Sequence, residues 1–408
     1  MEPTKKLYEN DSYKKEFTAR VLDCRENGEN WLILLDATGF FPEGGGQGAD
    51  RGILRPLTQS APEHTDHKLS DHTYQGEVQV LDVHIRDGLI QHTCNGPLKP
   101  GSPVKGILDW KLRYSNMQQH TGEHIVSGIA HRTFGVNNVG FHLGSQVVTL
   151  DFDQFLTEEQ VDWLEEAANQ AVWANHPVEI SYPDAFQLQN LDYRSKIEIE
   201  DQVRIVTIQN VDICACCAPH VNHTGEIGLI KVINHQKYKG GIRLSILCGD
   251  RALQEVRHNQ RQISQISALL SVKPESAAQG VEHLHREYQD AKYRGIQLQT
   301  ERVLDLIRYL PPEQENVCLF VPELDVPAMR RAVNAMQENH GGYCGIFVGN
   351  DEAGYRYQIV SKTHDSRLAG QLLKQHFICR GGGKADMIQG QITGTKEEIQ
   401  KVFSSLEI

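Results

Sequence analysis

The sequence has 408 residues, of which 39% are apolar and 23% are charged, and its formal net charge is −12. A chain of this length is expected to form two or three domains. The excess of acidic residues argues against a protein that holds nucleic acid by bulk electrostatics, although it leaves open one that reads RNA through a local patch. Because no run approaches about 18 apolar residues and the N-terminus lacks the apolar core of a signal peptide, we expect no membrane association and a cytosolic location.

Residues 1–108 are predicted to be rich in β-strands. Two runs, Phe17–Leu22 and Trp31–Leu35, are separated by a polar turn, which is a hairpin signal, and strand-like runs follow at Glu77–Val83 and Gly88–Thr93. A small open β-barrel is the economical fold for such short strands.

A glycine-rich segment lies between the second and third of these strands. Gly44, Gly45 and Gly46 allow a close backbone approach or positive φ angles, and Gln47 places a neutral amide directly after them. Taken alone, this segment is equally typical of a flexible turn. The polar segment Gln59–His72 is predicted to be a mobile loop.

Residues 109–249 are predicted to mix helices and strands. The expected helices run from Asp109 to Ala130 and from Thr157 to Trp173, the second with a capping box at Thr157-Glu158-Glu159-Gln160. The expected strands are Gln146–Phe152, Val203–Ile208, Leu229–Asn234 and Ile242–Leu247.

Two pairs of metal-binding residue types stand out in this region. His120 and His124 are four residues apart, so a helix places both imidazoles on one face. Cys216 and His220 form a second pair with the same spacing. Three imidazoles and a thiolate suit tetrahedral zinc. Either pair alone has a plain alternative, because such histidines often decorate a helix surface and cysteines are often simply buried.

Residues 250–310 are predicted to form two long helices separated by Pro274, either as an antiparallel hairpin or as a coiled coil that makes a homodimer. Residues 311–408 alternate strand and helix and are predicted to form a small α/β domain. This domain ends in a glycine-rich loop, whose residues are Arg380, Gly381, Gly382, Gly383 and Lys384.

The order of these elements resembles the editing half of alanyl-tRNA synthetase and its free-standing relatives, the AlaX trans-editing proteins. The resemblance rests on four stretches: Phe41–Gln47, Met117–His124, Cys216–His220 with Thr224–Gly228, and Arg380–Gly390. It covers almost the whole chain and implies the long AlaX form, an α+β protein with domains at 1–108, 109–249, 250–310 and 311–408.

The resemblance also implies roles for particular residues. The zinc ligands of the family correspond to His120, His124, Cys216 and His220, and its amino-acid pocket loop corresponds to Gly44–Gln47. The C-terminal loop resembles that of the DHH-associated domain, which implies tRNA contact at Arg380–Lys384.

Two motifs depart from the family pattern. The usual Cys-Gly-Gly-Thr-His is here Cys216-Cys217-Ala218-Pro219-His220, which lowers the flexibility of the loop and adds Cys217 as a competing thiolate. Lys384 replaces a common histidine, which fits a phosphate contact but not phosphoesterase chemistry.

The implied reaction is hydrolysis of the ester between tRNA(Ala) and a wrong amino acid, chiefly serine and also glycine. Candidates to meet the serine hydroxyl are the Gly44–Gln47 loop, Thr38 and Thr121, because a polar partner discriminates against a methyl group. Glu123 is a candidate base, with a solvated helix residue as the alternative. Four protein ligands leave no open position on zinc, so either Cys216 is displaced or the metal orients the substrate.

Two other functions remain open at this point. The first is a catalytically lapsed, zinc-containing tRNA-binding module, which the altered Cys216–His220 segment favours. The second is a deacylase of another mischarged tRNA, since no single motif reveals the identity of the tRNA.

Overall fold

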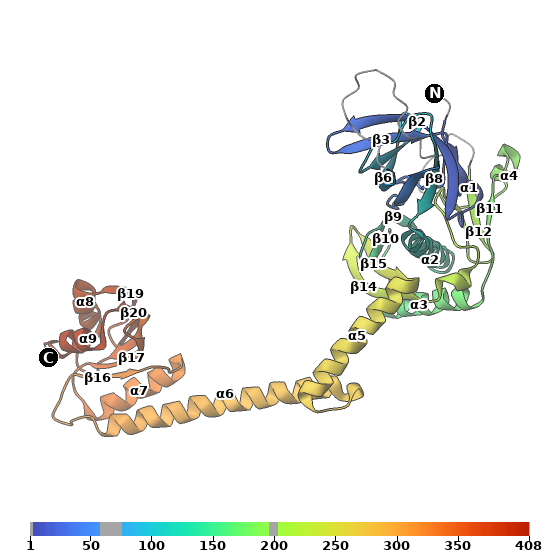
Figure 1. Cartoon of the computed structure of the whole chain (residues 1–408). Coiled ribbons are helices and arrows are strands. Elements are labelled where there is room, and N and C mark those ends of the chain that lie inside the picture. The colour runs from blue at the N-terminus through green and yellow to red at the C-terminus, as the bar shows by residue number, and fades with distance from the viewer. Residues whose placement is uncertain (1–2, 58–75, 196–202, 408) are drawn as a thin grey trace, which may run out of the picture. The chain divides into compact units, whose positions relative to one another are not determined.

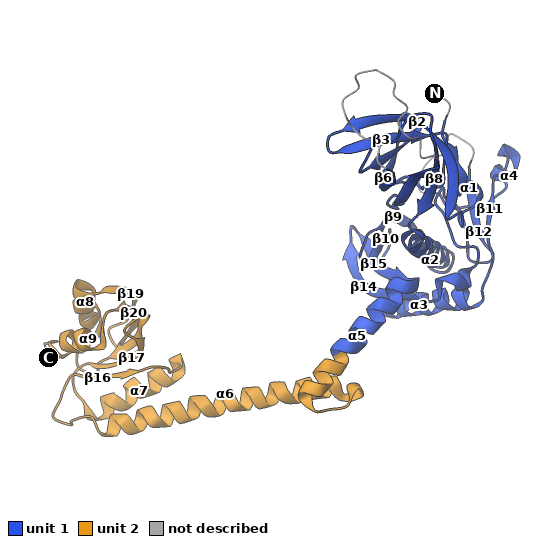
Figure 2. Cartoon of the chain, in the orientation of Figure 1, with its two compact units in different colours: residues 1–262 blue, residues 263–408 orange. Residues whose placement is uncertain are grey.

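The computed structural model describes residues 3–57, 76–195 and 203–407. The chain divides into two compact units, residues 1–262 and residues 263–408 (Figures 1 and 2). The predicted mobile loop at Gln59–His72 lies outside the described residues. The finer division into four domains stays a prediction.

Unit 1 begins with a closed six-stranded antiparallel barrel in the order β2-β3-β7-β6-β5-β8. Its strands are β2 (Glu16–Asn27), β3 (Asn30–Leu35), β5 (Gly52–Pro56), β6 (Val78–Arg86), β7 (Leu89–Cys94) and β8 (Pro103–Leu108). Every second residue of β7 and β8 is buried, as a barrel wall requires. The predicted small barrel is confirmed, but the expectation that it is open is wrong, because β8 pairs with both β2 and β5 and leaves no free edge.

A short N-terminal segment lies against the barrel. It consists of β1 (Lys5–Lys6) and α1 (Leu7–Asn10), and β1 pairs in parallel with β4 (Ala37–Thr38). Tyr8 of α1 is buried in the barrel core, where its ring meets Phe41 edge to face.

Helix α2 (Trp110–Phe134) organises the rest of unit 1. It begins at Asp109, whose side chain accepts a hydrogen bond from the Leu112 amide at 3.1 Å, and it ends at Gly135 with a φ of 68°. Nearly all of its side chains between Ser115 and Ala130 are buried, so the helix is enclosed rather than amphipathic.

A four-stranded antiparallel sheet packs against α2, in the order β14-β15-β10-β9. Its strands are β9 (Asn138–Leu143), β10 (Val148–Phe152), β14 (Ile230–Tyr238) and β15 (Gly241–Cys248). Helix α3 (Glu158–Trp173) completes this core and begins with the predicted capping box at Thr157. A Cβ at Gly122 of α2 would lie 2.3 Å from the sulfur of Cys248, so glycine permits the close contact of helix and sheet.

A second, three-stranded sheet carries the chain to the cysteine segment. It consists of β11 (Val178–Ser181), β12 (Ile205–Ile208) and β13 (Asp212–Ala215), all antiparallel. The short helix α4 (Ala185–Gln189) lies between β11 and β12 in sequence, and the 3-10 helix η1 (Thr224–Ile227) follows β13. The sequence patterns missed β9, β11 and β13, which are short or interrupted by polar residues.

One buried ion pair joins the barrel to the start of α2. The side chains of Arg113 and Asp50 are 0% and 1% exposed, and Arg113 Nε donates to Asp50 Oδ2 at 2.9 Å. The same guanidinium donates to the carbonyls of Ser12 at 3.0 Å and Gly39 at 2.6 Å. Asp50 in turn accepts from the Phe41 amide at 2.6 Å. The ion pair therefore joins the two ends of the glycine-rich segment, since Phe41 precedes the glycines and Asp50 follows them.

Helices α5 (Gly249–Leu270), η2 (Pro274–Ser276) and α6 (Ala277–Arg308) confirm the two predicted long helices and the break at Pro274. Many of their apolar side chains are exposed, among them Leu253, Val256, Ile263, Leu269, Leu284, Tyr288 and Leu298. Both the hairpin and the dimer stay predictions.

Unit 2 ends in a five-stranded sheet in the order β16-β17-β18-β20-β19. Its elements are β16 (Val317–Val321), α7 (Val326–Asn339), β17 (Cys344–Asn350), β18 (Gly354–Val360), α8 (Ser366–His376), β19 (Ile378–Gly383), β20 (Met387–Thr393) and α9 (Lys396–Ser404). Helix α7 packs on one face, whereas α8 and α9 pack on the other. The predicted glycine-rich loop is a strand, β19, because it pairs with β20 at the edge of the sheet.

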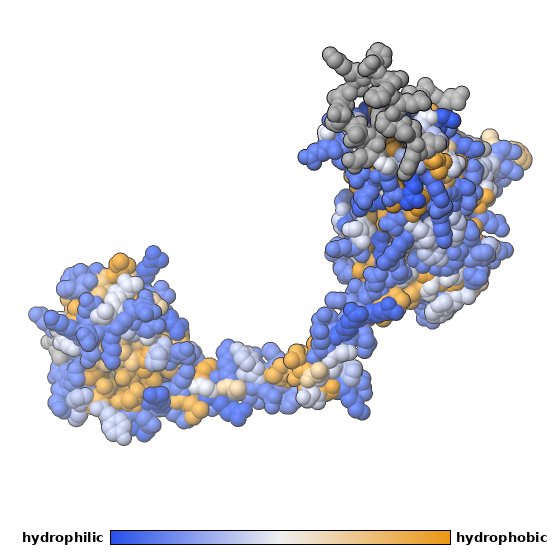
Figure 3. Space-filling view, in the orientation of Figure 1, coloured by the Kyte–Doolittle hydropathy of each residue, from blue (hydrophilic) through white to orange (hydrophobic). Residues whose placement is uncertain are grey.

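The space-filling view shows a largely hydrophilic surface on both units, with scattered apolar side chains (Figure 3). Among the helices of the described residues, none combines the length and the apolarity that crossing a lipid bilayer requires.

Replacing Asp50 with alanine should lower the free energy of unfolding of unit 1 by about 3–5 kcal/mol, because Arg113 would be left as an uncompensated buried charge. Urea denaturation of the full chain, followed by circular dichroism, measures this change. The matched control is Glu77→Gln, which breaks the exposed Arg55–Glu77 pair and should cost less than about 1 kcal/mol. Equal effects of the two substitutions would contradict the importance of the buried pair.

Candidate metal centre

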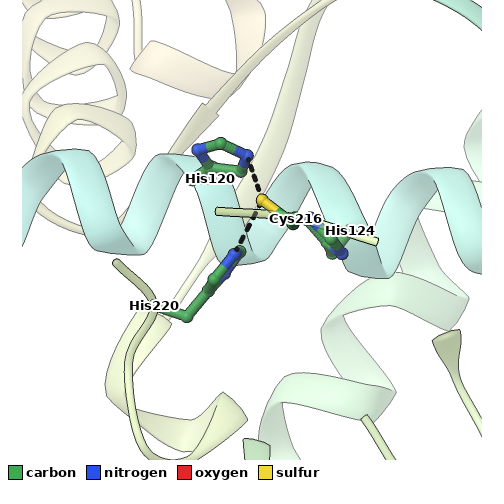
Figure 4. Close-up of side chains that lie close together, drawn as sticks. All are labelled: His120, His124, Cys216 and His220. Atoms are coloured by element: carbon green, nitrogen blue, oxygen red, sulfur yellow. Dashed lines mark hydrogen bonds between the residues drawn. The ribbon is translucent and has the colours of Figure 1, made fainter. Parts of the chain in front are cut away.

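The four residues predicted as metal ligands lie together in unit 1. His120 and His124 project from α2, and Cys216 and His220 come from the segment that follows β13 (Figure 4). One donor atom of each residue lies within 4.8 Å of the donors of the other three. The three histidines are each 2% exposed or less, whereas Cys216 is partly exposed.

The histidine rings present Nε2 to the sulfur of Cys216. His120 Nε2 lies 3.5 Å from Cys216 Sγ, and His220 Nε2 lies 3.4 Å from it. Burial alone would raise the pKa of the Cys216 thiol, but His120 and His220 outweigh burial and hold it well below its ordinary value. A lowered pKa favours the thiolate, the form in which cysteine binds metals.

Each histidine has a separate hydrogen-bond partner at its other ring nitrogen, Nδ1. These partners are Gln47 Oε1 for His120 at 2.8 Å, Asp212 Oδ2 for His124 at 2.9 Å and Thr121 Oγ1 for His220 at 3.1 Å. An acceptor at Nδ1 holds the proton there and leaves the lone pair of Nε2 free to bind a metal. All three rings are thus oriented with Nε2 toward one point.

His124, Asp212 and Arg194 form a linked set of hydrogen bonds, in which the Asp212 carboxylate lies between two nitrogen donors. Asp212 accepts from His124 and also from Arg194, whose Nε lies 2.7 Å from Oδ1. Burial raises the pKa of Asp212, but the hydrogen bonds from His124 and Arg194 dominate and hold it below its usual range. For His220, burial lowers the pKa to about 3, which keeps the ring neutral as a ligand must be.

The glycine-rich segment places Gln47 at the cluster through a tight turn. Gly44 and Gln47 exchange two backbone hydrogen bonds of 3.0 Å, and Gly45 and Gly46 have φ angles of 58° and 81°. The carbonyl of Gly46 accepts from the Leu143 amide of β9 at 2.7 Å, and a Cβ at Gly46 would lie 2.7 Å from the carbonyl oxygen of Phe141. Glycine is therefore needed here for both conformation and space, and the alternative of a merely flexible turn is wrong.

Two other predicted site residues, Thr38 and Glu123, are fully buried. Thr38 lies inside the barrel at 0% exposure, where its hydroxyl bonds His92 Nε2 at 2.9 Å and accepts from the Phe40 amide at 3.1 Å. Glu123 is fully buried, so the alternative of a solvated helix residue is wrong. Its Oε1 accepts from Ser127 and Asn138 at 2.7 Å, and its Oε2 lies 3.8 Å from His124 Nε2.

Cys217 does not join the cluster. Its side chain is exposed, whereas Cys216 is the thiol that meets the three histidines. In unit 2, Arg380, Gly381, Gly382 and Gly383 lie on the exposed edge strand β19, and Lys384 directly follows it.

Sequence reasoning missed Asp212 and Arg194, which orient His124. Asp212 begins β13 and Arg194 forms an isolated bridge to Cys214 of the same strand. Asp212 lies only four residues before Cys216, and that proximity is the one signal in the sequence that could have suggested it.

The donor set fits zinc. Three imidazole nitrogens and one cysteine sulfur are the borderline-soft donors that zinc binds tetrahedrally, and each imidazole has the second hydrogen bond that is usual at zinc sites. His124, Asp212 and Cys214 form a second group of close donors, which shares His124 with the first. Because Asp212 already accepts from Arg194, we assign it to orienting His124.

The chain is also similar in sequence to known proteins. Residues 203–245, which include Cys216 and His220, match the family described as threonyl and alanyl tRNA synthetase second additional domain. The chain is 26% identical over 420 residues to the alanyl-tRNA editing protein Aarsd1 of Rattus norvegicus, with 97% of both chains covered. The chain is AlaX-like.

The AlaX-like chain is also similar to alanine–tRNA ligases. It is 29% identical over 428 residues to the ligase of Ignicoccus hospitalis and 30% identical over 406 residues to that of Methanoregula boonei. These alignments cover 99% and 95% of the chain but only 43% and 41% of the ligases, so the chain spans less than half of their length.

Replacing Asp212 with asparagine should weaken zinc binding by about 10- to 100-fold, because His124 would lose the carboxylate that fixes its Nδ1 proton. Competition with a chromophoric chelator measures the dissociation constant. Asp151→Asn serves as the control, since Asp151 pairs with Arg243 on β15 and touches none of the four donors. An unchanged zinc affinity in Asp212→Asn would show that His124 is not held by Asp212 in the metal-bound state.

Proposed function

We propose that the chain is a trans-editing hydrolase that deacylates mischarged tRNA(Ala), chiefly seryl-tRNA(Ala) and also glycyl-tRNA(Ala). The observation that carries this proposal is the convergence of His120, His124, Cys216 and His220 with an acceptor at every histidine Nδ1. The name of the rat relative, an alanyl-tRNA editing protein of matching length, supports the choice of reaction.

The four residues would hold one zinc ion. Bound there, zinc supplies Lewis-acid chemistry, either activating water or polarising the ester. Gln47, Asp212 and Thr121 keep the Nδ1 protons in place, so the rings need no rearrangement when substrate arrives. Burial of the three rings excludes bulk water and strengthens each polar contact in the site.

Gln47 is the strongest candidate to recognise serine. Its Oε1 is occupied by His120, while its Nε2 is buried and has no hydrogen-bond partner among the described residues. A serine hydroxyl can accept from that nitrogen, whereas the methyl group of alanine leaves it unpaired, which costs binding energy. Glycine has no methyl group and fits any pocket that admits serine.

The two threonines are weaker candidates for this role. The hydroxyl of Thr38 is engaged by His92 and the Phe40 amide, and that of Thr121 is engaged by His220 and the Val221 amide. The role of Glu123 as a general base stays a prediction.

We also propose that the body of the tRNA contacts unit 2 through Arg380 and Lys384. Both lie in exposed positions at the ends of the Gly381–Gly383 run, whose bare backbone permits close approach of a phosphate chain. Dimerisation through residues 250–310 stays a prediction supported by the exposed apolar side chains of α5 and α6.

Replacing His120 or His124 with alanine should abolish both stoichiometric zinc binding and deacylation. The assay compares the hydrolysis of seryl-tRNA(Ala) and alanyl-tRNA(Ala) with and without a chelator, and zinc content is measured on the same samples. The wild type should release serine rapidly and spare alanine, and the chelator should stop the release.

The control for this experiment is His142→Ala, because His142 lies on β9 outside the donor cluster. Intact ester with both tRNAs, in a wild-type protein that retains zinc, would contradict the editing function and favour the tRNA-binding module instead.

A further inference from the structure

Between Cys216 and His220, the loop has few backbone contacts of its own. Its first residue is anchored, since the Cys216 amide donates to the Arg204 carbonyl at 3.0 Å. After its last residue, the Val221 amide donates to Thr121 Oγ1 at 3.3 Å. Apart from contacts with the Arg204 side chain, the backbone of residues 217–220 makes no hydrogen bond to any described residue. Pro219 contributes no amide hydrogen.

The side chain of Arg204 supplies the missing contacts. Arg204 lies just before β12 and is 3% exposed. Its Nη1 donates to the carbonyl of Cys216 at 2.7 Å and to the carbonyl of Ala218 at 3.1 Å. One nitrogen therefore holds the carbonyls on both sides of the exposed residue Cys217.

These two hydrogen bonds restrain the backbone between the two ligand residues, Cys216 and His220. The hydrogen bond to the Cys216 carbonyl fixes the peptide plane between Cys216 and Cys217. The hydrogen bond to the Ala218 carbonyl fixes the peptide plane between Ala218 and Pro219, just before His220. Because both carbonyls bond Arg204, the backbone of the loop cannot carry Cys216 and His220 away from each other without breaking charge-assisted hydrogen bonds. The usual Gly-Gly step of the family would give this loop more freedom than Cys217-Ala218 does.

We propose that Arg204 is a positioning residue of the metal centre, which holds the Cys216–His220 loop in the conformation that delivers thiolate and imidazole together. This inference rests on the metal site of the proposed function and is independent of its substrate. Arg204 acts through the two carbonyls and is not itself a ligand.

Cobalt(II) substitution of the full chain tests this role. A thiolate bound to cobalt gives a charge-transfer absorption band in the near ultraviolet, so the band reports whether Cys216 is coordinated, whether or not any tRNA is cleaved. Arg204→Met keeps an unbranched, largely apolar side chain and removes Nη1, the nitrogen that donates both hydrogen bonds. It should diminish the band strongly and weaken zinc binding by about 10- to 100-fold, the range expected when a residue that orients a ligand is lost.

Two further variants complete the experiment. Arg204→Lys keeps the charge but lacks the planar guanidinium, so it should give a band and an affinity between those of wild type and Arg204→Met. Arg243→Met removes an arginine of β15 that bonds Asp151, and it should leave both measurements unchanged.

Circular dichroism and urea denaturation show whether each variant folds. A folded Arg204→Met protein with the wild-type band and the wild-type zinc affinity would overturn the proposal, even if its stability were lower. If Arg204→Met does not fold, Arg204→Lys decides, and a band and affinity equal to those of wild type would again overturn it. A wild-type protein that shows the cobalt band but does not deacylate tRNA would count against the editing function alone, because the positioning role of Arg204 does not depend on the substrate.

Discussion

An imidazole has two nitrogens, and a metal can use one only if the proton is held on the other. This constraint shapes unit 1, because the three histidines draw their Nδ1 acceptors from three different parts of the chain. Gln47 comes from the barrel loop, Asp212 from the start of β13 and Thr121 from α2 itself. The barrel, the central helix and the small sheet must therefore be placed correctly together before the four donors converge.

The buried ion pair of Arg113 and Asp50 also helps to place the segments that meet at the four donors, although neither residue is a donor itself. It joins the first turns of α2 to the glycine-rich segment, whose tight turn then presents Gln47 to His120. Arg204 does for the Cys216–His220 loop what Arg113 does for the glycine-rich segment. In both cases a buried arginine bonds backbone carbonyls, and a ligand or its hydrogen-bond partner is held as a result.

Much of this structure could be predicted from the sequence because local patterns dominate it. Apolar spacing predicts helices such as α3 and α6, and a capping box also marks the start of α3. A spacing of four residues indicates each of the two metal-binding pairs. The closing strand β8 and the strand character of β19 could not be read locally, since both depend on partners far along the chain. The same holds for Asp212, Arg194 and Arg204, because an outer hydrogen bond to a ligand leaves no fixed spacing in the sequence.

The separations along the chain also determine when the centre can form. Gln47 precedes its partner His120 by 73 residues, and Cys216 follows it by 96. During synthesis, a chain that has emerged only through α2 offers a metal just the His120 and His124 pair, which is a weak and exposed site. Contacts between such distant segments close late in folding. The four donors can therefore come together only once unit 1 is complete.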